Sequence, residues 1–250
     1  MSDFGGRHII VTGASSGIGL ATARLLAARG ARVSMIARRA ELLEKEAAAM
    51  PGEAAGFAAD VSDRAALEAA IAAATAHFGA PHGLFANAGS GGQFGPLASY
   101  EPEAFEQLLR VNLVGPFLAM RAVLPAMVAA GAGSIVLTGS LASARGMAMN
   151  AAYVASKHGV LGLARAAAME AAPHNVRVNC VIPGFIETPM LDNLGPEAEA
   201  AMRRRTPQGR TGTADEVARA VAFLLSDDAA HITAQAIAVD GGILGTLAVG

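Results

Sequence analysis

Two residues with suitable spacing for proton transfer are Tyr153 and Lys157. They are four positions apart, so on a helix they lie on one face and can be neighbours. A nearby ammonium group favours the phenolate form of a tyrosine, which suits such a pair to acid–base chemistry near neutral pH. The chain has two tyrosines, and the other is Tyr100. Because this spacing is common by chance, the assignment needs support from other residues.

Two further polar residues could serve the same chemistry. Ser140 follows a predicted strand at 134–138 and stands thirteen positions before Tyr153. A hydroxyl at the carboxyl end of a strand can donate to a carbonyl oxygen and stabilise the charge that develops there. Asn112 lies in a predicted helix, where an asparagine taken alone indicates a kink or a packing contact.

A glycine-rich turn joins the first predicted strand to the first predicted helix, and it reads Thr12-Gly13-Ala14-Ser15-Ser16-Gly17-Ile18-Gly19. Glycines let the backbone approach a phosphate, and the free N–H groups and dipole of a helix N-terminus attract an anion. The residues that we expect to bind the pyrophosphate of a dinucleotide are Gly13, Ser15, Ser16, Gly17, Ile18 and Gly19.

The elements that must position these residues alternate along the chain. Short apolar runs predict strands at 8–12, 32–37, 56–59, 83–86, 134–138, 176–181 and 236–239. Alanine-rich stretches predict helices at 17–29, 41–50, 64–78, 102–130, 151–171 and 215–225. This alternation predicts an α/β, Rossmann-type doubly wound parallel sheet of about seven strands, with helices on both faces. Asp63 and Thr213, the latter followed by Glu216, are candidate helix N-caps.

The chain reads as a single unit. We find no Pro/Ser-rich linker, charge block or short repeat, so we expect one dinucleotide-binding domain over 1–250. The stretch from Pro183 to Gly212 contains four prolines and no clear pattern. Long connections inside a compact domain are usually functional, which predicts a substrate lid at about 184–212.

Composition excludes several classes of protein. Apolar residues make up 53% of the chain and charged residues 16%, which excludes a disordered chain. The net charge of −2 offers no basic surface to nucleic acid or an anionic membrane, and no uninterrupted apolar run predicts a spanning helix. The N-terminus lacks a signal-peptide pattern and the lone Cys180 cannot form an internal disulfide, so we expect a cytoplasmic protein. The six histidines are scattered without the spacing of a metal site.

Together, these motifs resemble those of the short-chain dehydrogenase/reductase family. The matching segments are T-G-x-x-x-G-x-G at 12–19, N-A-G at 87–89, Y-x-x-x-K at 153–157 and a P-G turn at 183–184. The resemblance extends from Thr12 to the ending Val239-Asp240-Gly241-Gly242. It implies hydride exchange between a nicotinamide cofactor and a carbonyl carbon.

The resemblance also implies a role for each site residue. Ser140 would polarise the carbonyl, Tyr153 would be the acid or base, and Asn112 would hold a water that connects Lys157 to solvent. Lys157 would favour the phenolate and hold the nicotinamide ribose. The remaining cofactor contacts would come from Asp60 and Val61 at the adenine, from Asn87, Ala88 and Gly89 beside its ribose, and from Pro183, Gly184, Ile186 and Thr188 at the nicotinamide.

The end of the second predicted strand indicates which nicotinamide cofactor is used. Dinucleotide folds that bind NAD place an acid there for the ribose 2′-hydroxyl, whereas those that bind NADP place an arginine for the 2′-phosphate. In the family's pattern, Ala37 stands at the usual acid position and Arg38 at the usual phosphate-binding position. Arg39 follows them, and the two arginines favour NADP(H) over NAD(H). The turn departs from many NADP-preferring relatives, because Ser16 replaces a basic residue. The alternative is that both arginines are solvated residues that open a helix.

The sequence thus predicts an NADP(H)-dependent oxidoreductase that interconverts a ketone and a secondary alcohol. The residues expected to line its pocket are Phe94, Leu141, Ala142, Met147, Met149, Met190, Leu191 and Leu194. Such a pocket is mainly apolar and adaptable, so we expect an apolar substrate rather than a sugar.

Two alternatives stay open. A 3-oxoacyl-[acyl-carrier-protein] reductase is the nearer one, because 183–188 resembles that group. Against it, Val128-Ala129-Ala130 ends the long helix without the basic residues that receive an acidic carrier protein. The other is a cofactor-sensing protein without chemistry, which the complete set of catalytic residues disfavours. Most members of the family are homotetramers or, less often, homodimers, and the apolar tail at 243–250 suits burial against another subunit.

Overall fold

The computed structural model describes residues 4–191 and 195–246. Within these residues, seven strands form one parallel sheet in the order β3-β2-β1-β4-β5-β6-β9. The strands are β1 (His8–Thr12), β2 (Arg32–Ala37), β3 (Ala54–Ala58), β4 (Gly83–Ala86), β5 (Gly133–Thr138), β6 (Val176–Pro183) and β9 (Ala236–Val239). After β3, at one edge, the chain returns to place β4 beside β1, so the strand order reverses there. The predicted Rossmann-type doubly wound sheet is confirmed.

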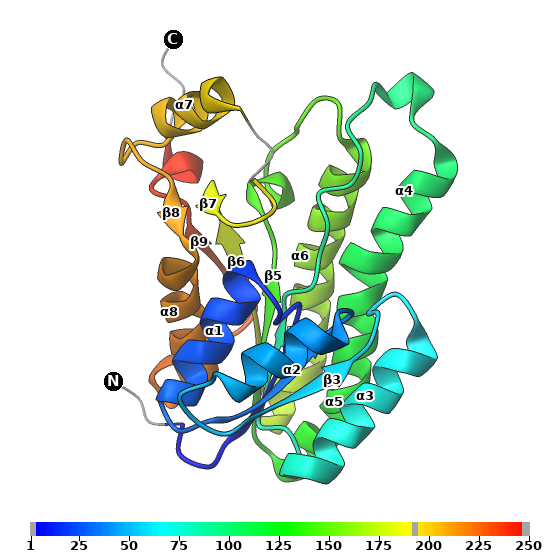
Figure 1. The fold of residues 1–250 in the computed structure, drawn as a ribbon, viewed down its shortest axis with the longest axis vertical. Helices are drawn as coiled ribbons and strands as arrows, with labels where there is room; N and C mark the ends of the chain where they lie inside the picture. The colour runs from blue at the N-terminus through cyan, green and yellow to red at the C-terminus, as the bar shows by residue number, and fades with distance from the viewer. Residues whose placement is uncertain (1–3, 192–194, 247–250) are drawn as a thin grey trace.

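Helices cover both faces of this sheet (Figure 1). One face is covered by α1 (Gly17–Ala28), α2 (Ala40–Ala48) and α8 (Ala214–Leu225), and the other by α3 (Arg64–Phe78), α5 (Gly115–Ala130) and α6 (Ala151–Ala171). Successive side chains of a strand point to opposite faces. Thus Ile10 of β1 packs in the core under α3 and α5, whereas Ile9 and Val11 pack in the core under α1 and α8. Both faces of the strands are therefore apolar, as in a buried parallel sheet.

Two predicted helix starts are confirmed. At the start of α3, Asp63 accepts a hydrogen bond from Ala66 N at 3.0 Å. At the start of α8, Thr213 and Glu216 form a capping box in which Thr213 N donates to Glu216 Oε2 at 2.8 Å. These side chains satisfy N–H groups that have no partner inside the first turn of a helix.

The helix predicted over 102–130 is not one uninterrupted α-helix. A π-helical turn at Arg110–Val114, which contains Asn112, joins α4 (Pro102–Leu109) to α5. Pro116 has no N–H and cannot make the α-helical bond to the Asn112 carbonyl, which favours a wider turn at this point. The predicted helical stretch is therefore confirmed, with a π-helical turn in its middle.

The same stretch, Pro102–Ala130, has the length and composition of a membrane-spanning helix. Its most apolar 18-residue window has a mean hydropathy of 1.8, although charged residues interrupt every apolar run. A core helix can pass the same test, and 39% of this window is buried inside the molecule. Because α5 packs against α3, α6, β4 and β5, the stretch forms part of one layer of the α/β fold.

The segment predicted to be irregular contains regular elements. β7 (Ile186–Glu187) and β8 (Gly212–Thr213) pair in parallel at its two ends, and α7 (Pro196–Arg205) lies between them. The helix signals are a proline at the first position, acidic residues in the first turn and arginines in the last turn. The prediction of irregular structure is wrong there.

Two strand boundaries also differ from the prediction. β3 occupies 54–58 rather than 56–59, and β6 extends to Pro183 rather than ending at residue 181.

Candidate active site

The predicted site residues gather beyond the carboxyl ends of the strands. These ends lead in turn to the glycine turn (β1), Arg38 and Arg39 (β2), Asp60 and Val61 (β3), Asn87, Ala88 and Gly89 (β4), Ser140 (β5) and Gly184 (β6). In an open parallel sheet, ligands bind in the crevice at this edge, where the strand order reverses. Here the reversal lies between β1 and β4.

The glycine turn has the geometry of a phosphate cradle. Gly13 and Gly17 have φ angles of +66° and +55°, which residues with side chains rarely adopt. A Cβ at Gly13 would lie 2.8 Å from Ala88 Cα, and one at Gly19 would lie 2.3 Å from Gly13 O. The side chain of Ser16, the N-cap of α1, makes no capping bond within the described structure, so the first N–H groups of α1 are left for an anion. The turn therefore fits the pyrophosphate of a nicotinamide dinucleotide.

Thr12, which has no predicted role of its own, braces this turn. It is buried at the end of β1, and its Oγ1 accepts hydrogen bonds from Asn87 N at 3.0 Å and Ala88 N at 3.1 Å. The Asn87 side chain donates in return to Thr12 O at 3.3 Å and to Gly13 O at 3.5 Å. The signal in the sequence is a hydroxyl directly before the first glycine, at the end of a buried strand.

Arg38 and Arg39 occupy different environments at the end of β2. Arg39 Nη2 donates to Ser15 Oγ at 3.2 Å, which holds this guanidinium against the glycine turn. Arg38 is exposed, and its Nη1 lies 3.9 Å from Asp60 Oδ2. Partial burial raises the pKa of Asp60, but hydrogen bonds from Ser62 and the charge of Arg38 outweigh it and hold this pKa below its ordinary value. Two cations therefore border the predicted adenosine site.

Tyr153 and Lys157 lie together in the first turns of α6. Asn150 caps this helix, because its Oδ1 accepts a hydrogen bond from Tyr153 N at 3.2 Å. Lys157 is buried, its Nζ lies 5.7 Å from the centre of the Tyr153 ring, and it donates to Thr138 O at 2.8 Å. The lysine is thereby anchored to the end of β5 while it stays next to the phenol.

Ser140 keeps its proton available for donation. It caps a short 3₁₀ turn at Leu141–Ser143, where its Oγ accepts a hydrogen bond from Ala142 N at 3.2 Å. Its backbone N–H donates to Ser143 Oγ at 3.1 Å. In the bond from Ala142 N, the Ser140 oxygen is the acceptor. The Ser140 O–H can therefore still donate to a substrate oxygen.

Asn112 is buried and joins three segments. Its Oδ1 accepts from Ser90 N at 2.8 Å, and its Nδ2 donates to Ser90 O at 2.9 Å and to Ser156 Oγ at 3.2 Å. A Cβ at Gly89 would lie 3.3 Å from Asn112 Oδ1 and 3.8 Å from Lys157 Nζ. The structure therefore brings Asn112 and Lys157 to the same side of the N-A-G segment.

The residues predicted to hold the nicotinamide begin the segment that contains α7. Thr188 Oγ1 donates to Ile186 O at 3.3 Å. A Cβ at Gly17 would lie 3.3 Å from Thr188 Cγ2, so this segment approaches the glycine turn. Gly184 has no room for a side chain, because its Cβ would lie 2.7 Å from Asp240 Cα.

Most of the predicted substrate-pocket residues are exposed. The large apolar ones are Phe94 (70%), Met147 (41%), Met149 (50%) and Met190 (55%). Ala142 is buried, and Leu194 lies outside the described residues. Leu191 lines a cavity of about 470 Å³ together with Glu187, Thr188, Pro189, Glu199, Met202 and Thr211.

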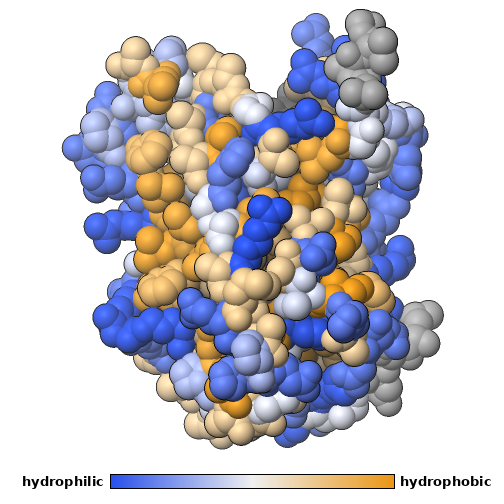
Figure 2. Space-filling model, turned by 180° about the vertical axis from the view of Figure 1, so that it is seen from behind, coloured by the Kyte–Doolittle hydropathy of each residue, from blue (hydrophilic) through white to orange (hydrophobic). Residues whose placement is uncertain are grey.

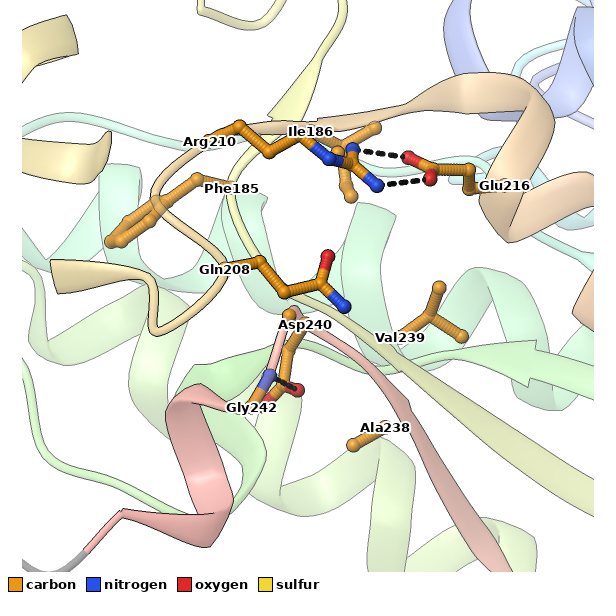
Figure 3. A pocket seen from close by; sticks show the side chains of 11 residues that line it. Phe185, Ile186, Gln208, Arg210, Glu216, Ala238, Val239, Asp240 and Gly242 are labelled. Atoms are coloured by element: carbon orange, nitrogen blue, oxygen red, sulfur yellow. Dashed lines mark hydrogen bonds and ion pairs between the residues drawn. The ribbon is translucent and has the colours of Figure 1, made fainter. Parts of the chain in front are cut away.

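A further cavity, of about 340 Å³, lies between β8, β9 and the start of α8 (Figure 3). Arg210 donates two hydrogen bonds to Glu216 across it, at 2.9 and 2.6 Å, and Asp240 accepts one from Gly242 N at 2.9 Å. The four residues predicted to be catalytic line neither cavity. They lie instead at the carboxyl end of β5, in the first turns of α6 and in the π-helical turn before α5.

Comparison with known proteins decides the family. A family model described as enoyl-(acyl carrier protein) reductase, one of the short-chain dehydrogenase/reductase models, matches residues 13–244. Levodione reductase from Leifsonia aquatica is 40% identical over an alignment 252 positions long, which covers 96% of this chain and 94% of that protein. The chain belongs to the short-chain dehydrogenase/reductase family.

Other proteins similar to this short-chain dehydrogenase/reductase are also dehydrogenases or reductases. Cyclohexanol dehydrogenase from Acinetobacter sp. (strain SE19) is 41% identical over 241 residues, which cover 95% of each protein. A 3-oxoacyl-[acyl-carrier-protein] reductase from Thermotoga maritima is 36% identical over 242 residues, covering 96% of this chain and 98% of that protein. The crystal structure of levodione reductase matches with a TM-score of 0.94 at 38% identity, covering 98% of this chain and 100% of that chain. The chain is therefore an enzyme, a nicotinamide-dependent oxidoreductase acting on CH–OH or C=O groups.

Replacing Thr12 with valine tests the brace between β1 and β4. Valine matches threonine in shape, so T12V leaves the partly buried N–H groups of Asn87 and Ala88 without this acceptor. Two buried unpaired groups at roughly 1–3 kcal/mol each would cost about 2–6 kcal/mol. Because water reaches these groups in part, we expect the free energy of unfolding to fall by about 2–3 kcal/mol in urea denaturation. The control T12S keeps the acceptor and should stay within about 1 kcal/mol of the wild type. Equal losses in both variants would show that the hydroxyl does not hold the two segments together.

Proposed function

We propose that this enzyme uses NADP(H) to interconvert a mainly apolar ketone and the corresponding secondary alcohol. The observation that supports the reaction most directly is the buried Lys157 ammonium, whose Nζ lies 5.7 Å from the centre of the Tyr153 ring. This position places a cation next to the phenol that we assign to proton exchange.

Tyr153 and Ser140 act on the substrate oxygen. When bound, the nicotinamide cofactor supplies or accepts the hydride at the substrate carbon. Tyr153 gives its phenolic proton to the oxygen in the reducing direction and takes it back in the oxidising direction. Ser140 donates a hydrogen bond to the same oxygen and keeps its proton, which stabilises the negative charge that develops there.

Lys157 and Asn112 support the tyrosine. An ammonium has three donors, and Thr138 O takes one of them at 2.8 Å. The other two are left for a ribose hydroxyl and for water. Asn112 and Lys157 both lie next to Gly89. Asn112 stands in the π-helical turn, where Pro116 has no N–H to donate to the Asn112 carbonyl. In this role Asn112 holds the water through which protons reach Tyr153.

The residues that we assign to the cofactor follow the strand ends. They are Gly13, Ser15, Ser16, Gly17, Ile18, Gly19, Arg38, Arg39, Asp60, Val61, Asn87, Ala88, Gly89, Tyr153, Lys157, Pro183, Gly184, Ile186 and Thr188. The preference for NADP(H) is supported by two guanidinium groups at the end of β2, where Ala37 replaces an acid. Arg39 is already held by Ser15, so it loses little freedom when it binds a phosphate.

An apolar substrate is supported by the exposed apolar side chains near the crevice. Among the residues assigned to the pocket, Phe94, Met147 and Met190 present large apolar surfaces to solvent. An apolar ligand would cover part of this surface, whereas a polyol would not. The names of two relatives, levodione reductase and cyclohexanol dehydrogenase, also support a ketone or alcohol substrate.

A 3-oxoacyl-[acyl-carrier-protein] reductase is the second candidate. It is supported by the description of the matching family model and by the relative from Thermotoga maritima. An acidic carrier protein needs a basic docking surface. The end of α5, at Val128-Ala129-Ala130, offers no charge, which favours the free ketone. A cofactor sensor would have no need for Tyr153 beside Lys157.

We also propose one domain over 1–250, in which the segment at about 184–212 acts as a substrate lid, and a homotetramer or homodimer. Figure 2 shows hydrophobic surface on the side of the molecule that bears α4, α5 and α6. On and beside these helices, Val114, Phe117 and Met169 are exposed apolar residues that another subunit could cover.

The lone cysteine, Cys180, is buried, and burial raises the pKa of its thiol to about 11. A single cysteine suits a reducing compartment such as the cytoplasm.

Turnover by Tyr153→Phe tests the reaction. Nicotinamide absorbance is followed with NADPH and NADH over a panel of apolar ketones, diketones, sugars and acyl thioesters. We expect the fastest turnover with NADPH and apolar ketones, and a loss of about 10³-fold or more in Y153F with unchanged NADPH binding. The control Y100F removes the other tyrosine hydroxyl, which donates to Gln93 O at 3.1 Å rather than to the reacting atoms, so it should leave kcat within about twofold of the wild type even if KM rises.

Other outcomes of this panel would point elsewhere. Faster turnover of acyl thioesters would favour the carrier-protein reductase, and faster turnover of polyols would contradict the apolar pocket. Near-normal turnover in Y153F would refute the role of this tyrosine. NADPH binding without turnover of any compound would favour the sensor.

Cofactor binding by Arg39→Ala and Arg38→Ala tests the NADP(H) preference. We expect R39A to weaken NADPH binding about tenfold or more in a fluorescence titration, because it removes a charge-assisted phosphate contact, and to leave NADH binding nearly unchanged. R38A should have a smaller effect, because Asp60 already offsets its charge. The control R64A changes an arginine on α3 that pairs with Glu68. Equal affinity of the wild type for NADPH and NADH would refute the preference.

Light scattering tests the assembly. We expect a mass at micromolar concentration that is two or four times the 25.1 kDa of one chain. Charged substitutions on the exposed apolar face, F117E and M169E, should lower this mass. A monomeric wild type would contradict the proposal.

A further inference from the structure

Residues 90–95, which we call the 90–95 loop, run from the end of β4 alongside the start of α6 (Figure 1). The loop is fixed at four points, one of which is Gln93 O, which accepts a hydrogen bond from the Tyr100 hydroxyl at 3.1 Å. Asn112 pairs with both backbone groups of Ser90, at 2.8 and 2.9 Å. Gly91 O accepts a hydrogen bond from Asn150 Nδ2 at 2.8 Å. Gly95 N donates to Met149 O at 2.7 Å.

Asn150 uses both ends of its amide group. Its Oδ1 accepts from Tyr153 N at 3.2 Å and caps α6, while its Nδ2 donates to Gly91 O. The residue is 1% exposed, so water does not compete for either bond. One buried side chain therefore connects the helix that bears Tyr153 to the loop that bears Phe94.

The residue before Asn150 has an unusual backbone conformation. Met149 has a φ of +67°, a conformation that residues with side chains rarely adopt. Such strain persists only where the surrounding structure imposes it, and it is concentrated at functional sites. Here it accompanies the bond from Gly95 N to the Met149 carbonyl. The junction at 149–150 thus holds both ends of a short segment that contains Phe94.

We propose that Asn150 is a positioning residue, which sets the place of the 90–95 loop relative to Tyr153 and so determines how the substrate is held against the phenol. The inference rests on the proposed function, in which Tyr153 exchanges the proton and Phe94 contacts the substrate. Loss of the bond to Gly91 frees the loop and weakens substrate binding. Loss of the helix cap also displaces Tyr153 and slows the chemical step.

Two substitutions separate these effects. Serine is as good a helix N-cap as asparagine, but its side chain is too short to donate to Gly91 O, so N150S keeps only the cap. Alanine lacks both groups, so N150A loses both bonds. The matched control is N175S, at an exposed asparagine whose Nδ2 donates to Gly131 O at 3.0 Å at the start of β6.

Steady-state kinetics with NADPH and an apolar ketone give the first readout. We expect N150S to raise KM for the ketone about five- to tenfold, the effect of one lost hydrogen bond, with kcat within about twofold of the wild type. N150A should raise KM similarly and lower kcat as well. N175S should change neither. An unchanged KM in N150S, equal losses of kcat in N150S and N150A, or a matching effect in N175S would overturn the proposal.

Hydrogen–deuterium exchange gives a second readout that does not depend on activity. We expect exchange in the 90–95 loop to be at least about threefold faster in N150S, with the first turn of α6 unchanged, and faster in both segments in N150A. Absence of turnover in the wild type would refute the proposed function and leave exchange to decide the role of Asn150. Unchanged exchange of the loop in N150S would refute the positioning role even if the enzyme reduces ketones.

Discussion

The hydroxyl of Thr12 lies where the sheet divides, and the arrangement of the whole site depends on it. β1 and β4 are paired neighbours, but one is followed by α1 on one face and the other by a loop that leads to the opposite face. When two strands part in this way, the backbone groups just beyond them lose their partners in the ladder, and buried N–H groups need other acceptors. Thr12 Oγ1 accepts from two of them and so keeps the crevice open without unsatisfied donors.

From Thr12, a chain of hydrogen bonds crosses the sheet to the lysine. Asn87 donates to the carbonyls of Thr12 and Gly13, and its Oδ1 accepts from Thr138 Oγ1 at 3.2 Å. The Thr138 carbonyl in turn accepts from Lys157 Nζ. Because Oδ1 is used by Thr138 and Nδ2 by the turn, the orientation of the Asn87 amide is determined. The turn that we assign to the pyrophosphate and the lysine that we assign to catalysis are thus positioned by one connected network.

The segment that contains α7, which we assign to the substrate, is built differently, with anchored ends and a largely exposed middle. The ends of the segment that contains α7 are held by the β7–β8 pair and by a bond from Thr211 Oγ1 to Glu187 Oε1 at 2.5 Å. Arg210 and Thr213 bind the Glu216 carboxylate and lower its pKa to about 2, so this anchor stays charged at any physiological pH. Between these anchored ends, the described residues at 188–191 and 195–205 are exposed or half-buried. Anchored ends with an exposed middle suit a site whose walls adjust to the ligand.

The sequence by itself determined the order of the elements, the helix caps at Asp63 and Thr213, and the chemical groups that follow each strand. These features depend on local patterns: apolar periodicity, capping residues and glycines beside a helix start. The structure corrected the segment predicted to be irregular, because α7 has no buried residues and so no apolar periodicity marks it, and it showed a π-helical turn inside the helical stretch at 102–130. Only the tertiary structure decided the bonds of Asn112 to Ser156, Thr138 to Asn87 and Asn150 to Gly91, which join residues 44, 51 and 59 positions apart. Such contacts form only after the sheet has brought its strand ends together, so no local pattern in the chain predicts them.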